Sequence, residues 1–260
     1  MKKLWLAAFL LPVVALAAES SFNGTWKIDL NKVQFPDKPE SWVLHDGRYQ
    51  CSTCQPAVDV KADGTDQPTP GARYRDTLAV KVVDAKTVEM TDKKGGKVVA
   101  VGRATVSADG KTLSTEFTSY PEASPQPVTG KTTVARVAAG PAGAHAISGS
   151  WRAEKVDTVS TNALTFTLKV SADGMMSSSA TGETYDAKFD GKDYPVKGDR
   201  AGAVVSLTKI DERSIDEATK IGGKVLYVSH MTVSADGKTM TVKSDDKERG
   251  TTTTWVATKQ

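Results

Sequence analysis

The chain has 260 residues, of which 39% are hydrophobic and 25% are charged. This length exceeds that of a disulfide-stapled miniprotein and suffices for one large domain or two ordinary ones. The composition is typical neither of a disordered tail nor of a membrane protein. The formal net charge of +3 falls to +1 without Lys2 and Lys3. The charge balance therefore excludes the basic footprint of a protein that binds nucleic acid or an anionic membrane.

Residues 1–18 have the three parts of an export signal. Lys2 and Lys3 form a basic start, Leu4–Val14 is a short apolar run, and Ala15-Leu16-Ala17 offers a small-x-small cleavage site. The apolar run is shorter than the roughly 20 residues that span a bilayer. We therefore expect cleavage near Ala17 or Ala18 and a periplasmic or secreted product without a membrane span.

The chain after the signal is an internal duplication. The eight residues Thr105–Thr112 recur letter for letter as Thr232–Thr239, and Gly95–Val98 recurs as Gly222–Val225 at the same offset of 127 residues. The prediction is a first domain over residues 19–139, a small-residue linker over 140–146 and a second domain over 147–260. Copy one and copy two below denote residues 19–139 and 147–260.

Each copy reads as all-β. Residues 78–82 alternate apolar and polar side chains, which is the period of a half-buried strand. Residues 108–111 (ADGK) lie between two β-branched runs, where Gly110 can supply the positive φ of a hairpin. Residues 209–220 have a helical composition, but their partner 82–93 reads as strand-turn-strand, so both are predicted as strands. We expect about eight or nine short strands per copy, arranged as an antiparallel meander barrel.

Cys51 and Cys54 are the one constellation in copy one that the architecture does not require, since copy two has no cysteine. An oxidising compartment favours a disulfide between them. Two alternatives stay open: a redox-active pair, and a metal site that also uses His45. Gln55 follows the second cysteine, so a covalent haem site is excluded.

Both copies open on a Gly-x-Trp motif, at Gly24-Thr25-Trp26 and Gly149-Ser150-Trp151. This pattern resembles the lipocalin signature. The chain also resembles exported bacterial proteins with lipocalin-like domains in the sequences of residues 190–196, 205–211 and 233–239. The resemblance implies that Trp26 and Trp151 close the base of each barrel and that Arg136 packs over the tryptophan of copy one. Copy two has no arginine on its last strand, so this part of the pattern is missing there.

The resemblance implies export and a barrel, and brings no catalytic residue with it. No nucleophile elbow, phosphate loop, zinc-protease helix or calcium loop occurs in the sequence. We therefore expect a non-enzymatic protein without a cofactor that binds a small apolar ligand. The candidates for lining that site are Trp42, Tyr74, Tyr194 and Trp255. The alternatives are an interaction module with filled barrels, and an envelope redox or metal module built on Cys51 and Cys54.

Overall fold

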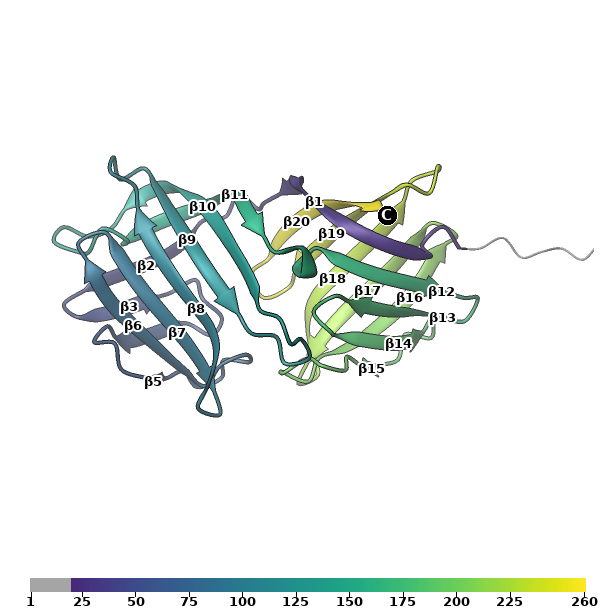
Figure 1. The fold of residues 1–260 in the computed structure, drawn as a ribbon, viewed down its shortest axis with the longest axis horizontal. Helices are drawn as coiled ribbons and strands as arrows, with labels where there is room; N and C mark the ends of the chain where they lie inside the picture. Colours follow the sequence, from purple (N-terminus) through teal and green to yellow (C-terminus); the bar gives the residue numbers. More distant parts are fainter. Residues whose placement is uncertain (1–19) are drawn as a thin grey trace, which may run out of the picture.

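A computed structural model of the chain describes residues 20–260 and shows two antiparallel β-barrels side by side (Figure 1). The predicted export signal lies outside the described residues. Copy one supplies ten strands: β1 (Gly24–Gln34), β2 (Glu40–His45), β3 (Arg48–Cys51), β4 (Val58–Lys61), β5 (Gln67–Pro68), β6 (Thr77–Asp84), β7 (Thr87–Lys94), β8 (Lys97–Val106), β9 (Thr112–Ser119) and β10 (Val128–Ala139). Copy two supplies β11 (Gly149–Val159), a 3-10 turn (Thr161–Ala163), β12 (Thr165–Val170), β13 (Gly174–Ser179), β14 (Thr184–Lys188), β15 (Tyr194–Pro195), β16 (Val204–Asp211), β17 (Ser214–Ile221), β18 (Lys224–Val233), β19 (Thr239–Asp246) and β20 (Thr251–Lys259).

The all-β prediction and the tandem-barrel prediction are confirmed. One sheet has the order β4-β3-β2-β11-β10-β9-β8-β7-β6-β5, and the other has the order β14-β13-β12-β1-β20-β19-β18-β17-β16-β15. Each sheet curls until its two edges nearly meet. An isolated bridge joins the edges in each case, from Asp63 to Lys81 in the first sheet and from Thr184 to Lys197 in the second. Residues 82–93 and 209–220 are both strand-turn-strand, as the repeat indicated.

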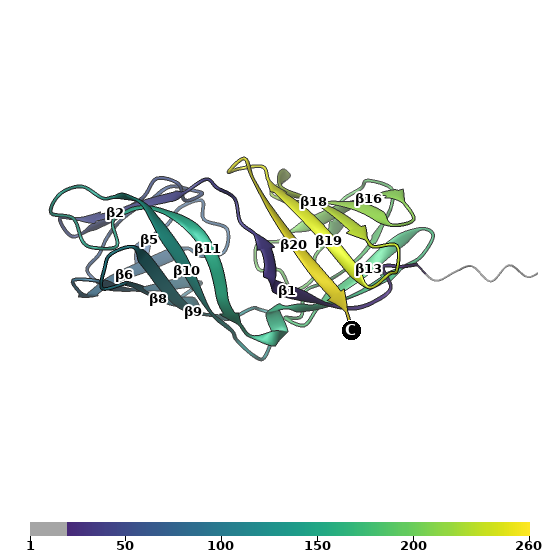
Figure 2. The same cartoon turned by 90° about the horizontal axis from the view of Figure 1, so that it is seen from above.

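The first strand of each copy lies in the barrel of the other copy. β1 pairs with β12 and β20, whereas β11 pairs with β10 and β2. Figure 2 shows β1 alongside β20, in the other barrel from β2. The first barrel is therefore residues 40–159, and the second barrel is residues 24–34 together with 165–260. The predicted domain boundaries follow the sequence repeat, and the strand pairing corrects them by one strand in each copy.

The predicted linker 140–146 is likewise corrected, because it is the connection between the paired strands β10 and β11 inside the first barrel. A Cβ atom on Gly140 would meet the Cβ of Ser148 at 2.5 Å, so the small residues there permit close packing. The chain instead crosses between barrels at Phe35–Pro39 and again at residues 160–164. Pro36 and Pro39 hold the first crossing extended and disfavour a tight hairpin from β1 to β2.

The repeated turns have the predicted chemistry. Gly110 and Gly237 occupy equivalent positions in the two Asp-Gly turns and have φ of 73° and 71°. A side chain there would be strained, because L-residues seldom adopt positive φ. The preceding Asp109 and Asp236 each accept a backbone N–H two residues ahead, from Lys111 and Lys238. The turns therefore account for these repeated residues without any functional role.

A buried tryptophan fills one end of each barrel. Trp26 and Trp151 are 0% and 1% exposed, and each donates its indole N–H to a backbone carbonyl four residues earlier. Because the first strands are exchanged, Arg136 lies over the ring of Trp151, 4.0 Å from its centroid, and not over Trp26. Lys259 takes the equivalent place over Trp26, at 5.0 Å. These contacts close one end of each barrel with a cation stacked on an aromatic face.

Candidate functional site

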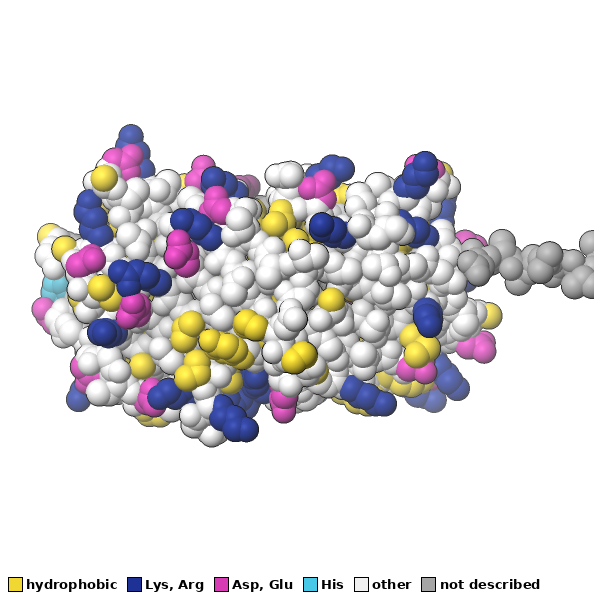
Figure 3. Space-filling model, viewed as in Figure 1, with side chains coloured by type: hydrophobic (Ala, Val, Ile, Leu, Met, Phe, Trp, Pro, Cys, Tyr) yellow, Lys and Arg dark blue, Asp and Glu magenta, His cyan; other side chains and the backbone are white. Residues whose placement is uncertain are grey.

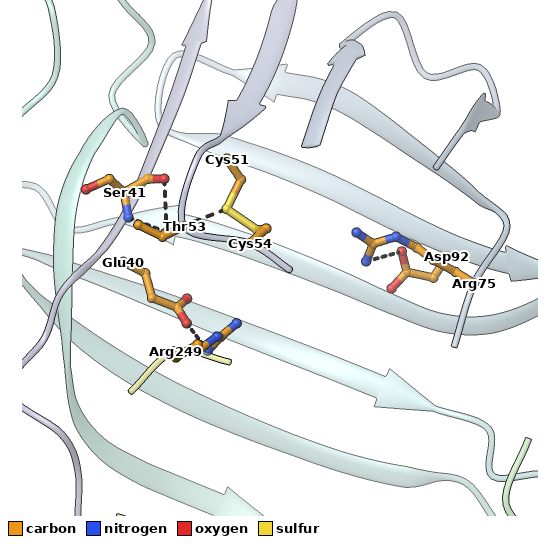
Figure 4. The surroundings of a disulfide bond; sticks show 8 residues. All are labelled: Glu40, Ser41, Cys51, Thr53, Cys54, Arg75, Asp92 and Arg249. Carbon is orange, nitrogen blue, oxygen red and sulfur yellow. Dashed lines mark hydrogen bonds and ion pairs between the residues drawn. A yellow bond between two sulfur atoms is a disulfide. The ribbon is translucent and has the colours of Figure 1, made fainter. Parts of the chain in front are cut away.

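Cys51 and Cys54 form a disulfide in the loop that follows β3 (Figure 4). Cys51 is fully buried and packs in the core of the first barrel, whereas Cys54 is half-buried beside it. Thr53 lies between them and ties the loop to β2, since its hydroxyl accepts the backbone N–H of Ser41 at 2.9 Å. The bond therefore fixes this loop against β2, and burial shields the Cys51 sulfur from an attacking thiol.

The metal alternative does not gain support from this geometry. His45 lies at the opposite end of the β2–β3 hairpin from Cys51, because Cys51 pairs with Trp42 while His45 pairs with Arg48. The Nδ1 of His45 is 3.0 Å from the carboxylate of Asp46. Within residues 20–260, no group of three or more His, Cys, Asp or Glu side chains is placed to hold a metal ion.

Charged side chains at the open end of the first barrel are paired. Arg75 and Asp92 form an ion pair at 3.3 Å, and burial raises the pKa of the Asp92 carboxyl against the opposing effect of Arg75. Glu40 pairs with Arg249, which arrives from the second barrel, at 2.5 Å (Figure 4). Asp92 and Glu40 therefore each lie beside a guanidinium group.

The second barrel has a different interior. Glu217 follows the buried Ile215 by two positions on β17, and Tyr185 precedes the buried Ala187 by two positions on β14, so both side chains face inward. The phenol of Tyr185 donates to the carboxylate of Glu217. Burial raises the pKa of the Glu217 carboxyl, and burial together with the charge of Glu217 raises the pKa of Tyr185. No salt bridge to Glu217 occurs among the described residues.

Aromatic and hydroxyl side chains line the rest of this interior. Phe166 on β12 and Trp255 on β20 meet edge to face with centroids 6.0 Å apart, and both pack against the core of the second barrel. Ser229 and Ser244 share a hydrogen bond of 3.1 Å on β18 and β19. Phe166, Trp255, Tyr185 and Glu217 are all half-buried, whereas the core residues at the tryptophan end are buried. These four side chains are therefore partly accessible to solvent.

The four predicted lining residues do not share one site. Trp255 lies in the second barrel as described. Trp42 lies in the first barrel and stacks on Trp151 with centroids 6.4 Å apart. Tyr194 packs at the edge of the second core, and its phenol donates to Asp190 at 3.1 Å. Tyr74 is 50% exposed and reaches across to Asp199 of the other barrel at 3.2 Å.

A hairpin of each copy contacts the open end of the other barrel. Glu248 in the β19–β20 turn accepts two N–H groups from Arg73 in the β5–β6 loop, at 2.6 and 2.8 Å. In the related contact, Glu122 in the β9–β10 loop lies 3.9 Å from Arg200 in the β15–β16 loop. Arg73 and Arg200 are 127 residues apart, so the two ion pairs use equivalent arginines. The same loop places Ala123 against Gly182, which has no room for a Cβ atom.

Hollows also occur on the outer faces of the sheets. A groove of ≈ 370 Å³ on β12–β14 has the exposed Met176 and Pro195 in its wall, together with Lys169, Asp186 and Lys197. Another of ≈ 320 Å³ lies on β7–β9. Figure 3 shows apolar side chains gathered over β8 and β9, with charges of both signs scattered around them.

We compared the chain with family models, with curated proteins and with solved structures. None of the three comparisons found a match. Among residues 20–260 no helix is long and apolar enough to cross a bilayer. The candidate site therefore rests on the geometry alone.

Sequence reasoning missed Glu217, Tyr185 and Phe166. The duplication itself could have identified Glu217. Its equivalent in copy one, 127 residues earlier, is Met90. Glu217 stands where the other copy has the apolar Met90, and it lies two residues after Ile215. Because alternate residues of a strand share a face, this pattern indicates a charged side chain on an inward face. Tyr185 and Phe166 lie in strands whose spacing differs between the copies, so no such comparison was open for them.

Proposed function

We propose that this protein is an exported, lipocalin-like, non-enzymatic binding protein that holds a small ligand in the open half of its second barrel. The observation that carries the proposal is the inward pair of Tyr185 and Glu217. Both are half-buried above a base that Trp26 fills. Ligand sites are typically concave and mostly apolar with a few converging polar groups, and this interior has that composition.

The contrast between the barrels supports the choice of the second one. The charged groups at the open end of the first barrel lie in ion pairs, Arg75 with Asp92 and Glu40 with Arg249. In the second barrel the inward carboxylate of Glu217 accepts hydrogen bonds from neutral hydroxyl groups, that of Tyr185 among them, and no basic side chain of residues 20–260 forms an ion pair with it. Buried groups with raised pKa values, such as Glu217 and Tyr185, are common at functional sites.

Native mass spectrometry of full-length protein recovered from its own cell envelope tests the proposal. We expect a reproducible extra mass that is released on denaturation and is lost in Tyr185→Phe. The matched control is Tyr49→Phe, which removes a buried phenol from the first barrel and should retain the ligand. A bare polypeptide mass for the wild type, or loss of the ligand in the control alone, would contradict a site in the second barrel.

A second candidate is an interaction module that acts through its outer surface. The groove around Met176 favours it, because this methionine is 50% exposed and is followed on its strand by three serines. Methionine is common at adaptable binding surfaces. A bare mass in the experiment above would favour this candidate, and Met176→Lys should then abolish the binding of a partner protein without lowering the melting temperature.

A further inference from the structure

We infer that the ligand of the second barrel is an organic cation whose ammonium group binds the carboxylate of Glu217. This inference rests on the proposed function and narrows it. The fold alone leads to the expectation of an apolar ligand, but the contacts inside this barrel favour a ligand with a positively charged group at one end.

The first step is the missing counter-charge. Glu217 faces the barrel interior and accepts a hydrogen bond from Tyr185, and no Lys, Arg or His side chain of residues 20–260 lies within ion-pair distance of it. Placing a carboxylate in an apolar interior without a cation costs free energy, and the cost falls when a cation pairs with it. The inward Asp92 of the first barrel has such a partner in Arg75, at 3.3 Å. The second barrel therefore lacks a cation that the first barrel contains.

The second step is that the fold does not need this carboxylate. The equivalent residue of copy one is Met90, which also lies on an inner face, two positions after the buried Val88. The two barrels have the same strand order, so a methionine fills this position without any change of architecture. A charged residue at a position that packing can fill with an apolar one is explained by binding better than by stability.

The third step concerns the walls of the site. Tyr185, Phe166 and Trp255 all face the interior of the second barrel. The faces of aromatic rings attract ammonium groups, and the attraction grows when water is excluded. A carboxylate combined with aromatic walls suits an amine that carries an apolar body. It disfavours a carboxylate ligand, which like-charge repulsion from Glu217 would reject.

The test uses three probes of similar size with the full-length protein: 2-phenylethylammonium, 2-phenylethanol and 3-phenylpropionate. Isothermal titration calorimetry at neutral pH should show binding of the ammonium probe about tenfold or more tighter than the alcohol. The carboxylate probe should not bind. Glu217→Gln should remove the preference for the ammonium probe, and Met90→Gln at the equivalent place in the first barrel should leave it unchanged.

The outcomes separate this inference from the proposed function. If the alcohol binds as tightly as the ammonium probe, and Tyr185→Phe weakens the binding of both, the second barrel binds ligands but the inferred preference for a cationic ligand is wrong. If none of the probes binds, the inference is overturned, and native mass spectrometry decides the proposed function on its own. Thermal unfolding adds an independent readout, because Glu217→Met should raise the melting temperature of the unliganded protein. A lower melting temperature would show that the carboxylate is structural and would overturn the inference.

Discussion

The contact between Glu248 and Arg73 joins the two barrels, and its contribution to stability can be worked out from the structure. Glu248 accepts two N–H groups from Arg73 and lies 2.7 Å from Lys224, with 11% of its side chain exposed. Hydrogen bonds from Arg73 and then Lys224 lower the pKa of the Glu248 carboxyl from 4.5 to about 2. This difference corresponds to at most about 3 kcal/mol. Screening at the rim of the interface reduces the expected contribution to about 1–2 kcal/mol.

The sign of the pH dependence follows from the lowered pKa. The stabilisation from Glu248 is fully present above its ordinary pKa of 4.5 and is lost as the pH falls toward 2, where the folded protein also binds the proton. Glu248→Gln should therefore lower the free energy of unfolding by about 1–2 kcal/mol at pH 7. The deficit relative to wild type should shrink between pH 5 and pH 2.5. Urea unfolding followed by tryptophan fluorescence measures both quantities.

The duplication supplies a matched control for this experiment. Glu122 forms the related contact with the equivalent arginine, but it is 63% exposed and lies 3.9 Å from Arg200. Glu122→Gln should change the free energy of unfolding by less than about 0.5 kcal/mol, since exposed single ion pairs contribute little. Equal losses in the two variants, or a loss in Glu248→Gln that stays constant down to pH 2.5, would refute the reasoning that the buried ion pair of Glu248 with Arg73 stabilises the contact between the barrels.

Three further predictions follow from the fold. Replacing Cys51 and Cys54 together by alanine should lower the free energy of unfolding by about 2 kcal/mol in urea titrations and leave the barrel signature in circular dichroism, because the closed loop is short. Arg136→Lys should cost about 2–4 kcal/mol in thermal unfolding, since the single nitrogen of a lysine cannot reach all three carbonyls that Nε, Nη1 and Nη2 of the guanidinium contact; a cost near zero would show those bonds to be dispensable. A fragment of residues 36–160 should give dispersed amide signals in NMR, whereas a fragment of residues 19–139 should not, because it lacks β11; the reverse result would contradict the exchanged strands.

The duplication made most of the fold predictable. Letter-for-letter repeats such as 105–112 and 232–239 fixed which segments share a structure, and the alternation of apolar residues identified the strands. The same likeness hid the exchange of first strands. Gly24-Thr25-Trp26 and Gly149-Ser150-Trp151 offer nearly the same pairing edge and the same buried ring, so neither pattern distinguishes one barrel from the other. The connection Phe35–Pro39 decides the matter through its geometry, and loop geometry is weakly encoded in residue patterns.

The packing partners and the candidate site were less accessible to sequence reasoning for related reasons. Arg136 was identified as a residue that packs on a tryptophan, but its ring belongs to the other copy. Lys259 performs the same task over Trp26 and was missed, because a lysine near a chain end carries no pattern that marks it. The contact between Tyr185 and Glu217 spans the barrel between β14 and β17, and such a contact depends on how far the sheet curls.

The exchanged first strand also sets the order in which the chain can complete its two sheets. During synthesis β1 emerges before every one of its partners, and its neighbour β20 is the last strand of the chain. The first barrel, residues 40–159, can finish its sheet while β1 still has an unpaired edge. Unpaired edges are prone to association with other chains. β1, with its eleven residues including Trp26, is therefore the segment that stays unpaired longest. A factor that holds the chain during folding would have to shield this segment from other chains.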